Sequence, residues 1–416
     1  MKQRYDSYKP SGIDWIGEIP SHWELLRMRF LCDMITGDKD TVNKVDDGEY
    51  PFYVRSPQIE RINSYSFDGE AVLMAGDGVG AGKVVHYANG KFDFHQRVYN
   101  FHNFKGIKGI LLYYYLKTLF KYKIEEGGAK NTVDSVRQPW LKDFPICVPP
   151  LAEQEVIAAW LDEKCGEIDA AISKVDRELE LIDELKQSEI SRVVTRGLNP
   201  DAPLRPSGID WIEDIPNHWK IAKTSQLFQG IGSGTTPTSG NMRYYAQEGY
   251  NWLQTGDLND GIIQETTKKI TKLALQEFSS LRIYPKGSIV IAMYGATIGK
   301  LGKLAIETTT NQACCVLPSS SIVSQNYSFY AYKAGKQSLI NSAYGGGQPN
   351  ISQETIKSFK IPLPPLSEQQ AIADYLDKKC AKIDGLKAKL VKKRETLKEL
   401  RQTIISEVVT GKRKVI

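Results

Sequence analysis

Two sequence blocks each occur twice in this chain, in the same order, and this repetition constrains the fold more than any other feature. The first block reads PSGIDWIGEIPSHW at residues 10–23 and PSGIDWIEDIPNHW at residues 206–219. The second block reads PPLAEQEVIAAWLDEKCGEID at residues 149–169 and PPLSEQQAIADYLDKKCAKID at residues 364–384. Because an internal repeat indicates one structural unit used more than once, the sequence predicts two copies of a common scaffold.

The segments between the blocks scarcely resemble each other, and they predict two α/β (α+β) globular domains. Short buried strands are expected at residues 71–74 (AVLM) and 288–292 (SIVIA), and a helix at residues 110–119. Glycine-rich stretches at residues 75–83 and 292–300 occupy matching places, so the domains are expected to share one fold while differing in polar detail. The expected organisation is an N-terminal domain at residues 1–150, a long helix at 151–198, a C-terminal domain at 199–365 and a second long helix at 366–416.

Each PPL block opens a long amphipathic helix. Its apolar residues alternate steps of four and three, which is the a/d seam of a coiled coil. Such a stripe is too narrow for the core of a globular domain, so the two helices are expected to form an antiparallel pair with pseudo-twofold symmetry. The alternative is that each helix folds back on its own domain. The expected seam residues are Leu161, Cys165, Ile168, Ile172, Val175, Leu179 and Ile182 in the first helix, and Leu376, Cys380, Ile383, Leu386, Leu390, Leu397, Leu400 and Ile404 in the second.

The composition is that of an ordinary globular protein and does not by itself distinguish between classes of function. Of the 416 residues, 41% are hydrophobic and 25% are charged, with a net charge of +5. The six cysteines form no C-x-x-C pair, so free and mostly buried thiols in a reducing compartment are expected. The sequence shows neither a signal-peptide core nor an apolar run near the ~20 residues of a membrane helix. A cytoplasmic protein without a membrane partner is therefore expected.

No catalytic motif stands out along the chain. The glycine-rich stretches lack the G-x-x-x-x-G-K-[ST] spacing of a phosphate-binding loop, and tight turns beside strands are the favoured interpretation. VPPL and LPPL lack the asparagine and the aromatic residue of the N-P-P-[YF] motif of amino-methyltransferases. The histidines have no metal-ligand spacing, and packing is the favoured role for His22 and His218, which belong to the repeated block. The chain is expected to be non-catalytic.

The blocks and their order resemble the specificity (S) subunit of type I restriction–modification systems. The resemblance rests on PSGIDWIGEIPSHW, PPLAEQEVIAAWLDEKCGEID and VVTRGL, followed by the same order ending in VVTGK, and it covers nearly the whole chain. IGSGTTP at residues 231–237 and WLQTGDL at residues 252–258 are similar to segments of that family's recognition domains. The first domain departs from this pattern, because ITGDKDT at residues 35–41 lacks the G-T-x-P form.

The resemblance implies a division of labour between this chain and its partners. Each variable domain is a target recognition domain that reads one half of a bipartite DNA sequence, and the helix pair sets the spacing between the half-sites. Because the two domains differ, the target is expected to be asymmetric. The implied partners are double-stranded DNA, two modification (methyltransferase) subunits and restriction subunits. S-adenosylmethionine, ATP and Mg²⁺ are expected on those subunits, and no cofactor or metal on this chain.

Polar residues in the loops of both domains are candidates for DNA contacts. Base edges are read by Arg, Lys, Asn and Gln, whereas phosphates attract Lys, Arg, hydroxyls and backbone N–H groups. Each such residue alone is more often a solvated or structural group, but their recurrence at matching places favours a shared role. The candidates are Arg55, Lys83, Gln96, Arg97, Lys130, Asn131 and Arg137 in the first domain, and Thr235, Thr236, Arg243, Thr255, Lys300, Asn311, Gln312, Gln348, Asn350 and Gln353 in the second.

A second function class stays open, namely a non-enzymatic scaffold whose two α/β domains bind proteins through their variable loops. The modest net charge of +5 slightly favours the scaffold. The order of motifs along the whole chain favours the DNA-specificity subunit. The two classes differ in the salt dependence of duplex binding, because counterion release gives DNA binding a steep slope.

Overall fold

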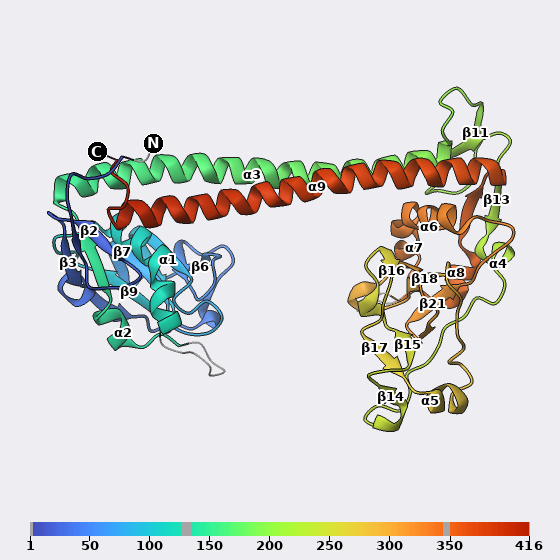
Figure 1. The fold of residues 1–416 in the computed structure, drawn as a ribbon, viewed down its shortest axis with the longest axis horizontal. Helices are drawn as coiled ribbons and strands as arrows, with labels where there is room; N and C mark the ends of the chain where they lie inside the picture. Colours follow the sequence, from blue (N-terminus) through green and yellow to red (C-terminus); the bar gives the residue numbers. More distant parts are fainter. Residues whose placement is uncertain (1–2, 127–134, 344–349, 416) are drawn as a thin grey trace. The chain divides into compact units, whose positions relative to one another are not determined.

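The chain folds into two compact units that each combine a globular domain with parts of two long helices. The computed structural model describes residues 3–126, 135–343 and 350–415. Unit 1 comprises Met1–Arg177 with Val391–Ile416, and unit 2 comprises Glu178–Leu390. The long helices are α3 (Leu151–Arg196) and α9 (Leu366–Val409) (Figure 1). Unit 1 therefore contains the start of α3 and the end of α9, and unit 2 contains the reverse.

A six-stranded sheet forms the centre of the first globular domain. Its strand order is β4-β9-β7-β8-β5-β6, and every pair is antiparallel except β5-β8. Helix α1 shares a core with β7 through Leu112 and Val72. Strand β7 and helix α1 confirm the elements expected at residues 71–74 and 110–119. The elements of unit 1 before α3 are β1 (Tyr8–Pro10), β2 (Glu18–Pro20), β3 (Glu24–Arg27), η1 (Met28–Phe30), β4 (Asp33–Thr36), η2 (Thr41–Asn43), β5 (Tyr50–Tyr53), β6 (Glu60–Ile62), β7 (Phe67–Ala75), β8 (Val85–Phe94), β9 (Val98–His102), α1 (Gly109–Glu126), α2 (Gln138–Lys142) and β10 (Pro145–Val148).

The second globular domain holds two four-stranded sheets, ordered β14-β17-β15-β20 and β16-β19-β18-β21. Helix α6 shares a core with β18 through Tyr327 and Ile291, as α1 does with β7 in unit 1. Strand β18 confirms the strand expected at residues 288–292. The elements of unit 2 before α9 are β11 (Leu204–Pro206), β12 (Asp214–Pro216), β13 (Lys220–Lys223), α4 (Thr224–Leu227), η3 (Met242–Tyr244), β14 (Tyr245–Ala246), β15 (Tyr250–Leu253), η4 (Thr255–Asp257), β16 (Gly261–Ile263), β17 (Lys268–Ile270), α5 (Lys272–Glu277), β18 (Ile289–Ala292), η5 (Gly295–Thr297), β19 (Leu301–Leu304), β20 (Thr309–Thr310), β21 (Cys314–Leu317), α6 (Gln325–Ala334), α7 (Lys336–Asn341), α8 (Gln353–Ser358) and β22 (Lys360–Leu363).

A glutamate–glutamine pair at the start of α3 ties this helix to the first repeated block. The Glu153 carboxylate accepts a hydrogen bond from Trp23 Nε1 at 2.9 Å and lies 2.6 Å from His22 Nε2. The Gln154 amide group accepts from the backbone N–H of Lys108 at 2.8 Å. Trp23 is fully buried. The helix start, the repeated block and the segment leading into α1 are therefore joined at one place.

The same construction recurs at the start of α9. Glu368 accepts from Trp219 Nε1 at 2.9 Å and lies 2.7 Å from His218 Nε2. Gln369 accepts from the backbone N–H of Ser324, at the start of α6, at 2.7 Å. Packing was the role expected for the two histidines of the repeated block. Both histidines are exposed, and they contact the glutamates through polar atoms instead of being packed in the core.

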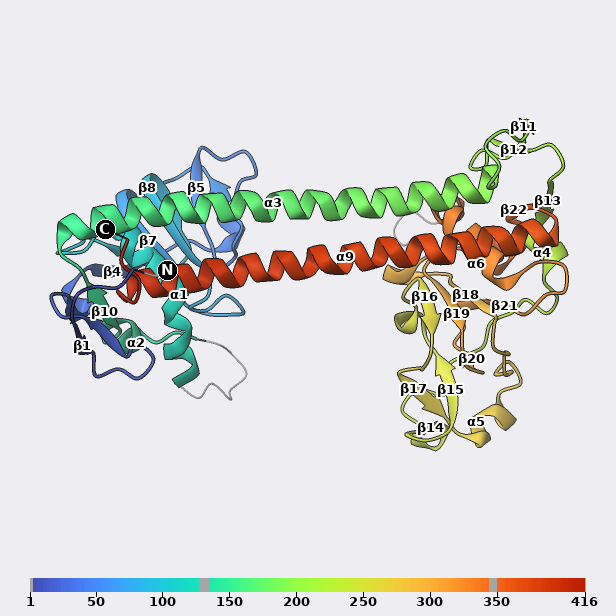
Figure 2. The same cartoon turned by 45° about the horizontal axis from the view of Figure 1, so that its top comes forward.

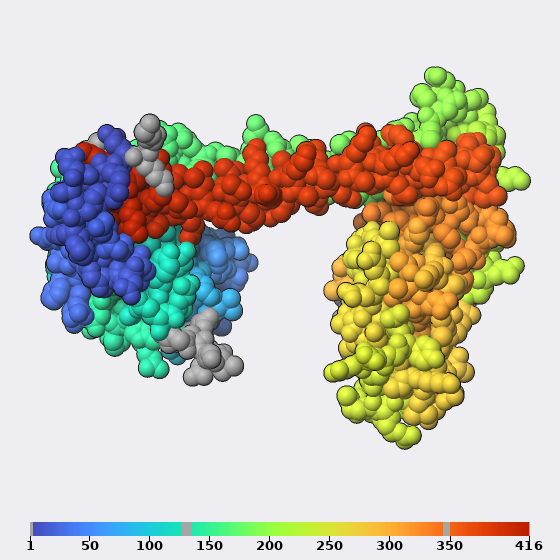
Figure 3. All heavy atoms as spheres, viewed as in Figure 1, coloured from blue at the N-terminus to red at the C-terminus, as the bar shows by residue number. Residues whose placement is uncertain are grey.

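The far end of each helix contacts a repeated block as well. Helix α9 ends at Val409, and Gly411, two residues later, has a φ of +73°, the left-handed conformation that favours glycine after a helix C-terminus. A Cβ at Gly411 would lie 2.2 Å from Pro20 Cδ. Tyr8 donates a hydrogen bond to the Gly411 carbonyl at 3.0 Å, and the N-terminal segment covers this end of α9 (Figure 3). In unit 2, Gly197 at the end of α3 lies against Trp219 in the same way.

Helices α3 and α9 run side by side within unit 1 (Figure 2). Ile168 and Ile404 belong to one core cluster. Asp169 pairs with Arg401 at 2.9 Å, and Asp176 pairs with Arg394 at 3.0 Å. The partners step seven residues forward on α3 and seven backward on α9, which is the register of an antiparallel coiled coil.

Within unit 2 the same pairing continues between the other parts of the helices. Asp183 pairs with Lys387 at 2.7 Å, and Lys186 pairs with Asp384 at 2.5 Å. The helices therefore pack together, as the sequence predicts. The alternative interpretation also holds for the helix starts, because Leu161 and Leu376 belong to the cores of the globular domains.

The seam of α9 differs from the expected one at two positions. Leu386 and Leu400 are 51% and 45% exposed. Steps of four and three from Ile383 reach Lys387 and Arg401 instead of Leu386 and Leu400, so basic residues occupy the positions that these adjacent leucines were expected to fill. The same steps reach Arg394, which pairs with Asp176. Among the other expected seam residues, Ile172, Leu390 and Leu397 are half-buried, and Leu161, Cys165, Ile168, Val175, Leu179, Ile182, Leu376, Cys380, Ile383 and Ile404 are buried.

Three further findings concern the chain as a whole. All six cysteines are free and buried, as expected. No helix in the described part of the chain combines the length and the apolar character needed to cross a bilayer. Within that same part, His, Cys, Asp and Glu side chains form no group of three or more that could hold a metal ion.

The Glu153 contact predicts a loss of stability when its acceptor is removed. Glu153→Leu leaves the buried Trp23 N–H without this partner, which should cost about 1–3 kcal/mol of unfolding free energy. Thermal denaturation of the full chain measures the loss. The matched control is Glu163→Leu on the same helix, because Glu163 forms only an exposed ion pair with Lys164, and its loss should cost about 0–1 kcal/mol. Equal melting temperatures for the two variants would contradict the proposed role of the contact.

Candidate nucleic-acid interface

A glycine lets one loop cross directly over a strand in each globular domain. In unit 1, a Cβ at Gly37 would lie 1.9 Å from the carbonyl oxygen of Phe94, the last residue of β8. In unit 2, a Cβ at Gly234 would lie 1.7 Å from the carbonyl oxygen of Thr310, the last residue of β20. Any side chain at these positions would collide with backbone. The loops after Gly37 and Gly234 therefore hold equivalent places, although only the second has the G-T-x-P form.

A glutamine follows each of these strand ends after one residue and contacts the crossing loop. Gln96 donates a hydrogen bond from Nε2 to Asp40 Oδ2 at 2.7 Å. Gln312 accepts one at Oε1 from Thr236 Oγ1 at 2.7 Å. The first glutamine therefore uses the nitrogen of its carboxamide, and the second uses the oxygen. Both side chains belong to exposed residues, so the two domains present the same residue type with different hydrogen-bond commitments.

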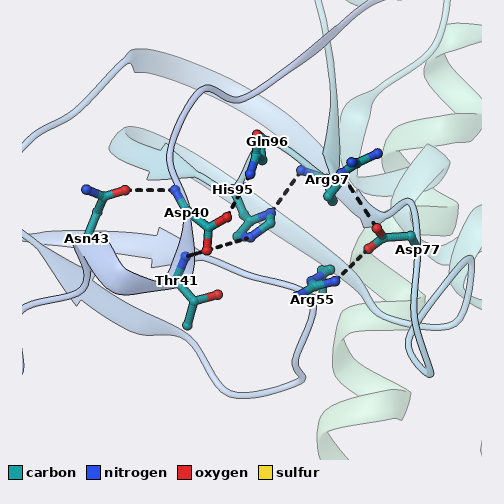
Figure 4. Close-up of polar contacts among 8 residues, drawn as sticks. All are labelled: Asp40, Thr41, Asn43, Arg55, Asp77, His95, Gln96 and Arg97. Carbon is teal, nitrogen blue, oxygen red and sulfur yellow. Dashed lines mark hydrogen bonds and ion pairs between the residues drawn. The ribbon is translucent and has the colours of Figure 1, made fainter.

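Asp40 is the centre of the polar contacts around Gln96 (Figure 4). Its carboxylate accepts from the backbone N–H of Thr41 at 2.6 Å, and its own backbone N–H donates to Asn43 Oδ1 at 2.8 Å. The hydrogen bonds from Thr41 and then Gln96 lower the pKa of Asp40 below its ordinary value. The carboxylate therefore stays ionised around neutral pH and holds the Gln96 amide in one orientation.

His95 lies buried beneath this contact. Its Nδ1 accepts from the backbone N–H of Arg97 at 2.9 Å, and its Nε2 lies 3.7 Å from Asp40 Oδ1. Because Nδ1 accepts, the proton of the neutral ring belongs on Nε2, on the side of Asp40. Burial, followed by the nearby charge of Arg55, lowers the pKa of His95 below its ordinary value. The neutral ring is the form that this site favours.

Asp77 joins two arginines beside this group (Figure 4). Arg55 Nη1 lies 3.0 Å from Asp77 Oδ1, and Arg97 Nε lies 3.7 Å from Asp77 Oδ2. The side chains of Arg55 and Arg97 are 43% and 64% exposed, whereas that of Asp77 is 22% exposed. The arrangement places two partly solvated guanidinium groups on either side of a more covered carboxylate.

Backbone hydrogen bonds put the loops of the two domains in register. The glycine-rich turns that follow β7 and β18 are each closed by an equivalent backbone hydrogen bond, in which a glycine N–H near the end of the turn donates to the carbonyl of the alanine that begins it. Both turns lie beside strands, as expected, and neither shows the helix start of a phosphate-binding loop. The paired bonds are Gly82 N to Ala75 O and Gly299 N to Ala292 O, His95 N to Tyr53 O and Asn311 N to Leu253 O, and Val136 N to Gly76 O and Ile351 N to Met293 O.

The structure gathers only some of the predicted contact residues. Arg55, Gln96 and Arg97 lie in one polar cluster, and Thr236 contacts Gln312. Two candidates have structural hydrogen bonds, because Asn311 Oδ1 accepts from the N–H of Ala313 and Gln353 donates to the carbonyl of Ile231. Lys130, Asn131 and Gln348 lie outside the described residues. Of the remaining candidates, Lys83, Arg137, Arg243 and Asn350 are exposed, and Thr235, Thr255 and Lys300 are half-buried.

Sequence reasoning missed Asp40, Asp77 and His95. The two aspartates accept hydrogen bonds, whereas the predicted contact residues were donors to DNA. A signal was nevertheless present, because Asp40 follows the Gly37 loop and Asp77 lies within the glycine-rich stretch. Of these two loops, only the glycine-rich stretch carries a predicted contact residue, Lys83.

Comparison with known proteins identifies the family of this chain. The chain matches the family described as the type I restriction modification DNA specificity domain, over residues 20–180 and 216–393. The chain belongs to this family.

Individual relatives are similar over nearly their whole length. The EcoDI specificity subunit of a type I restriction enzyme from Escherichia coli is 21% identical, over 95% of this chain and 89% of that protein. The MjaVIII specificity subunit from Methanocaldococcus jannaschii is 25% identical, over 95% of this chain and 94% of that protein. A chain solved in a study of assembly and conformational transition of the type I R-M system has a TM-score of 0.70 at 16% identity, over 94% of this chain and 98% of that one. This last likeness shows a common fold.

The environment of His95 predicts a pH dependence of stability in unit 1. The folded chain should bind the His95 proton less readily than the unfolded chain, so stability should fall as the pH drops below the ordinary value of 6.5 toward the lowered pKa. An NMR titration of His95 and melting curves between pH 7.5 and 5 measure the effect.

The matched control is His95→Asn, because asparagine occupies the equivalent position in unit 2 and accepts the equivalent backbone hydrogen bond. This variant should fold and lose the His95 part of the pH dependence. A His95 pKa above 6.5 in the folded chain would contradict the interpretation.

Proposed function

We propose that this chain is the DNA-binding specificity subunit of a type I restriction–modification complex. Each globular domain reads one half of an asymmetric bipartite target in double-stranded DNA. The single observation that carries the proposal is the equivalence of the two crossing loops, which share a backbone arrangement but present Asp40 and Gln96 in unit 1 and Thr236 and Gln312 in unit 2. One scaffold with two different polar surfaces is what reading two different half-sites requires.

The chain itself performs no chemical step in this proposal. Its partners are two modification subunits, which carry S-adenosylmethionine and the adenine methyltransferase site, and restriction subunits, which use ATP and Mg²⁺. Helices α3 and α9 set the spacing of the half-sites and dock the modification subunits. The family and the names of the curated relatives support this assignment. The complex would act in the cytoplasm, which holds the DNA that it recognises.

The domain boundaries proposed from the sequence follow the same division. Residues 1–150 and 199–365 are the two recognition domains, and residues 151–198 and 366–416 are the helical segments. Support comes from the bounds of α3 and α9, which begin at Leu151 and Leu366.

Binding to duplex DNA tests the proposal at its first step. The full chain, reconstituted with modification subunits, should bind duplex DNA with an affinity that falls steeply with salt, because log K falls by about 0.9 per neutralised phosphate for each unit of log salt concentration. Adenine methylation mapped in cells with and without the chain should reveal one asymmetric bipartite motif that depends on it. A protein-binding scaffold predicts little salt dependence and no change in the methylation map.

Gln312 and Gln96 provide a residue-level test. Gln312→Ala should relax the preference at one base pair of one half-site, since a bidentate base contact is worth about 1–3 kcal/mol of discrimination. Gln96→Ala should do the same in the other half-site. Competition binding with single-base variants of the target measures both effects.

The matched control is Gln337→Ala, which removes an exposed glutamine of unit 2 that bonds only along its own helix, to Asn341. It should leave the preference unchanged. Lys300→Ala, at the glycine-rich turn, should instead weaken all sequences alike and reduce the salt slope. Loss of preference in the Gln337 variant, or equal losses on every sequence in the Gln312 variant, would count against the assignment of Gln312.

A further inference from the structure

The backbone register identifies which residues of unit 2 correspond to the charged group of unit 1. Arg55 comes two residues after Tyr53, whose carbonyl accepts from the N–H of His95. In unit 2 the accepting carbonyl belongs to Leu253, and Thr255 comes two residues later. Thr255 is therefore the counterpart of Arg55.

The other two members of the group are matched by the same kind of evidence. Asp77 forms a β-bridge with Ser135, and Tyr294 forms a β-bridge with Asn350. Asp77 directly follows Gly76, whose carbonyl accepts a hydrogen bond from the N–H of Val136. Tyr294 directly follows Met293, whose carbonyl accepts one from the N–H of Ile351. Tyr294 is therefore the counterpart of Asp77.

The second arginine is matched through the residue that precedes its glutamine. The N–H of Arg97 donates to the side chain of His95, and the N–H of Ala313 donates to the side chain of Asn311. Arg97 and Ala313 are therefore counterparts. Unit 1 thus carries arginine, aspartate and arginine where unit 2 carries threonine, tyrosine and alanine.

The fold does not need the charges of this group. Unit 2 forms the same turn, the same β-bridge and the same strand-end contacts with uncharged residues at all three places. Exposed ion pairs contribute only about 0–1 kcal/mol to stability, and the side chains of Arg55 and Arg97 are 43% and 64% exposed. A stabilising role therefore explains neither the presence of the two arginines nor their convergence on one aspartate.

The geometry suits the recognition of a base edge. Asp77 contacts Nη1 of Arg55 and Nε of Arg97, and therefore leaves the terminal nitrogens of Arg97 outside this contact. An arginine fork donates two parallel hydrogen bonds to O6 and N7 of guanine in the major groove. Asp77 holds Arg55 by a hydrogen bond of 3.0 Å and attracts Arg97 at 3.7 Å by charge, and restricting the orientations of the guanidinium groups in this way reduces the entropy lost on binding.

We propose that Arg55 and Arg97, positioned by Asp77, recognise guanine in the half-site read by unit 1, and that unit 2 makes no such contact at the equivalent place. This inference rests on the proposed function. Arg55 and Arg97 are specificity-determining residues, and Asp77 is a positioning residue. Phosphate binding by the same arginines is the competing outcome, and it would give affinity without base preference.

To test this proposal, the full chain bound to modification subunits is used to select its preferred targets from a library of randomised DNA duplexes. The wild-type target should contain a G·C pair in one half-site. Arg97→Ala and Arg55→Ala should each reduce the preference for guanine in that half-site by on the order of 10- to 100-fold. Arg97→Lys is the decisive variant, because lysine keeps the charge for a phosphate and lacks the planar fork. Guanine preference should fall in this variant while the salt slope stays unchanged.

Asp77→Asn tests positioning, because it keeps the size of the side chain and removes its charge. It should reduce guanine preference in the same half-site and leave the other half-site unchanged. The matched control is Arg29→Ala, since Arg29 forms an ion pair of 3.0 Å with Asp143 elsewhere in unit 1 and is 45% exposed. Melting temperatures of all variants exclude loss of folding as the cause.

The outcomes separate this inference from the proposed function. If the wild type selects a bipartite target but no half-site loses guanine preference in the arginine variants, the inference fails and the proposed function stands. The same holds if Arg97→Ala weakens binding to every sequence alike and Arg97→Lys restores that affinity, because the arginine then binds phosphate as a charge. If the wild type selects no sequence at all, the proposed function itself fails.

Discussion

The internal arrangement of each unit depends on the hydrogen bonds of one carboxylate, that of Glu153 in unit 1 and that of Glu368 in unit 2. Each holds a buried tryptophan and a histidine of the repeated block against the first turn of a long helix. A buried indole N–H is costly to leave without an acceptor, so this contact fixes where the helix begins relative to the block. The neighbouring glutamine then ties the same turn to the segment before α1 or α6. Each globular domain is thereby oriented on its helix through the hydrogen bonds of two adjacent residues.

This fixed frame explains how the rest of each domain can vary. The backbone bonds that place the crossing loop and the glycine-rich turn recur in both units, so side chains can be exchanged at the loop positions without loss of the fold. The exchange is large: a group of three charged residues in unit 1 has uncharged counterparts in unit 2. Differences of this kind change which chemical groups meet a ligand, and they leave the positions of the loops unchanged.

Much of the architecture could be predicted from the sequence, because the repeated blocks and the spacing of apolar residues act locally. The seam of α9 could not, because Leu386 is adjacent to Lys387 and a leucine is the stronger apolar signal. Only the partner, Asp183, shows that the lysine faces α3. The polar cluster around Gln96 was predicted only in its donors. Asp40 is 56 residues away in sequence, and no local pattern connects such positions.

The charges along the helix pair also determine which helices can associate. Helix α3 contributes Asp169, Asp176 and Asp183, while α9 contributes the basic residues opposite them. Two α3 helices paired in the register of the repeat would keep an Asp169–Lys186 pair, but they would place Asp176 and Asp183 opposite Leu179 and Ile172, without counter-charges. The sign of the charges thus discourages homotypic association and makes α9 the proper mate of α3. Helix α9 thus supplies Arg394 and Lys387 as partners for two aspartates that a second α3 would leave unpaired.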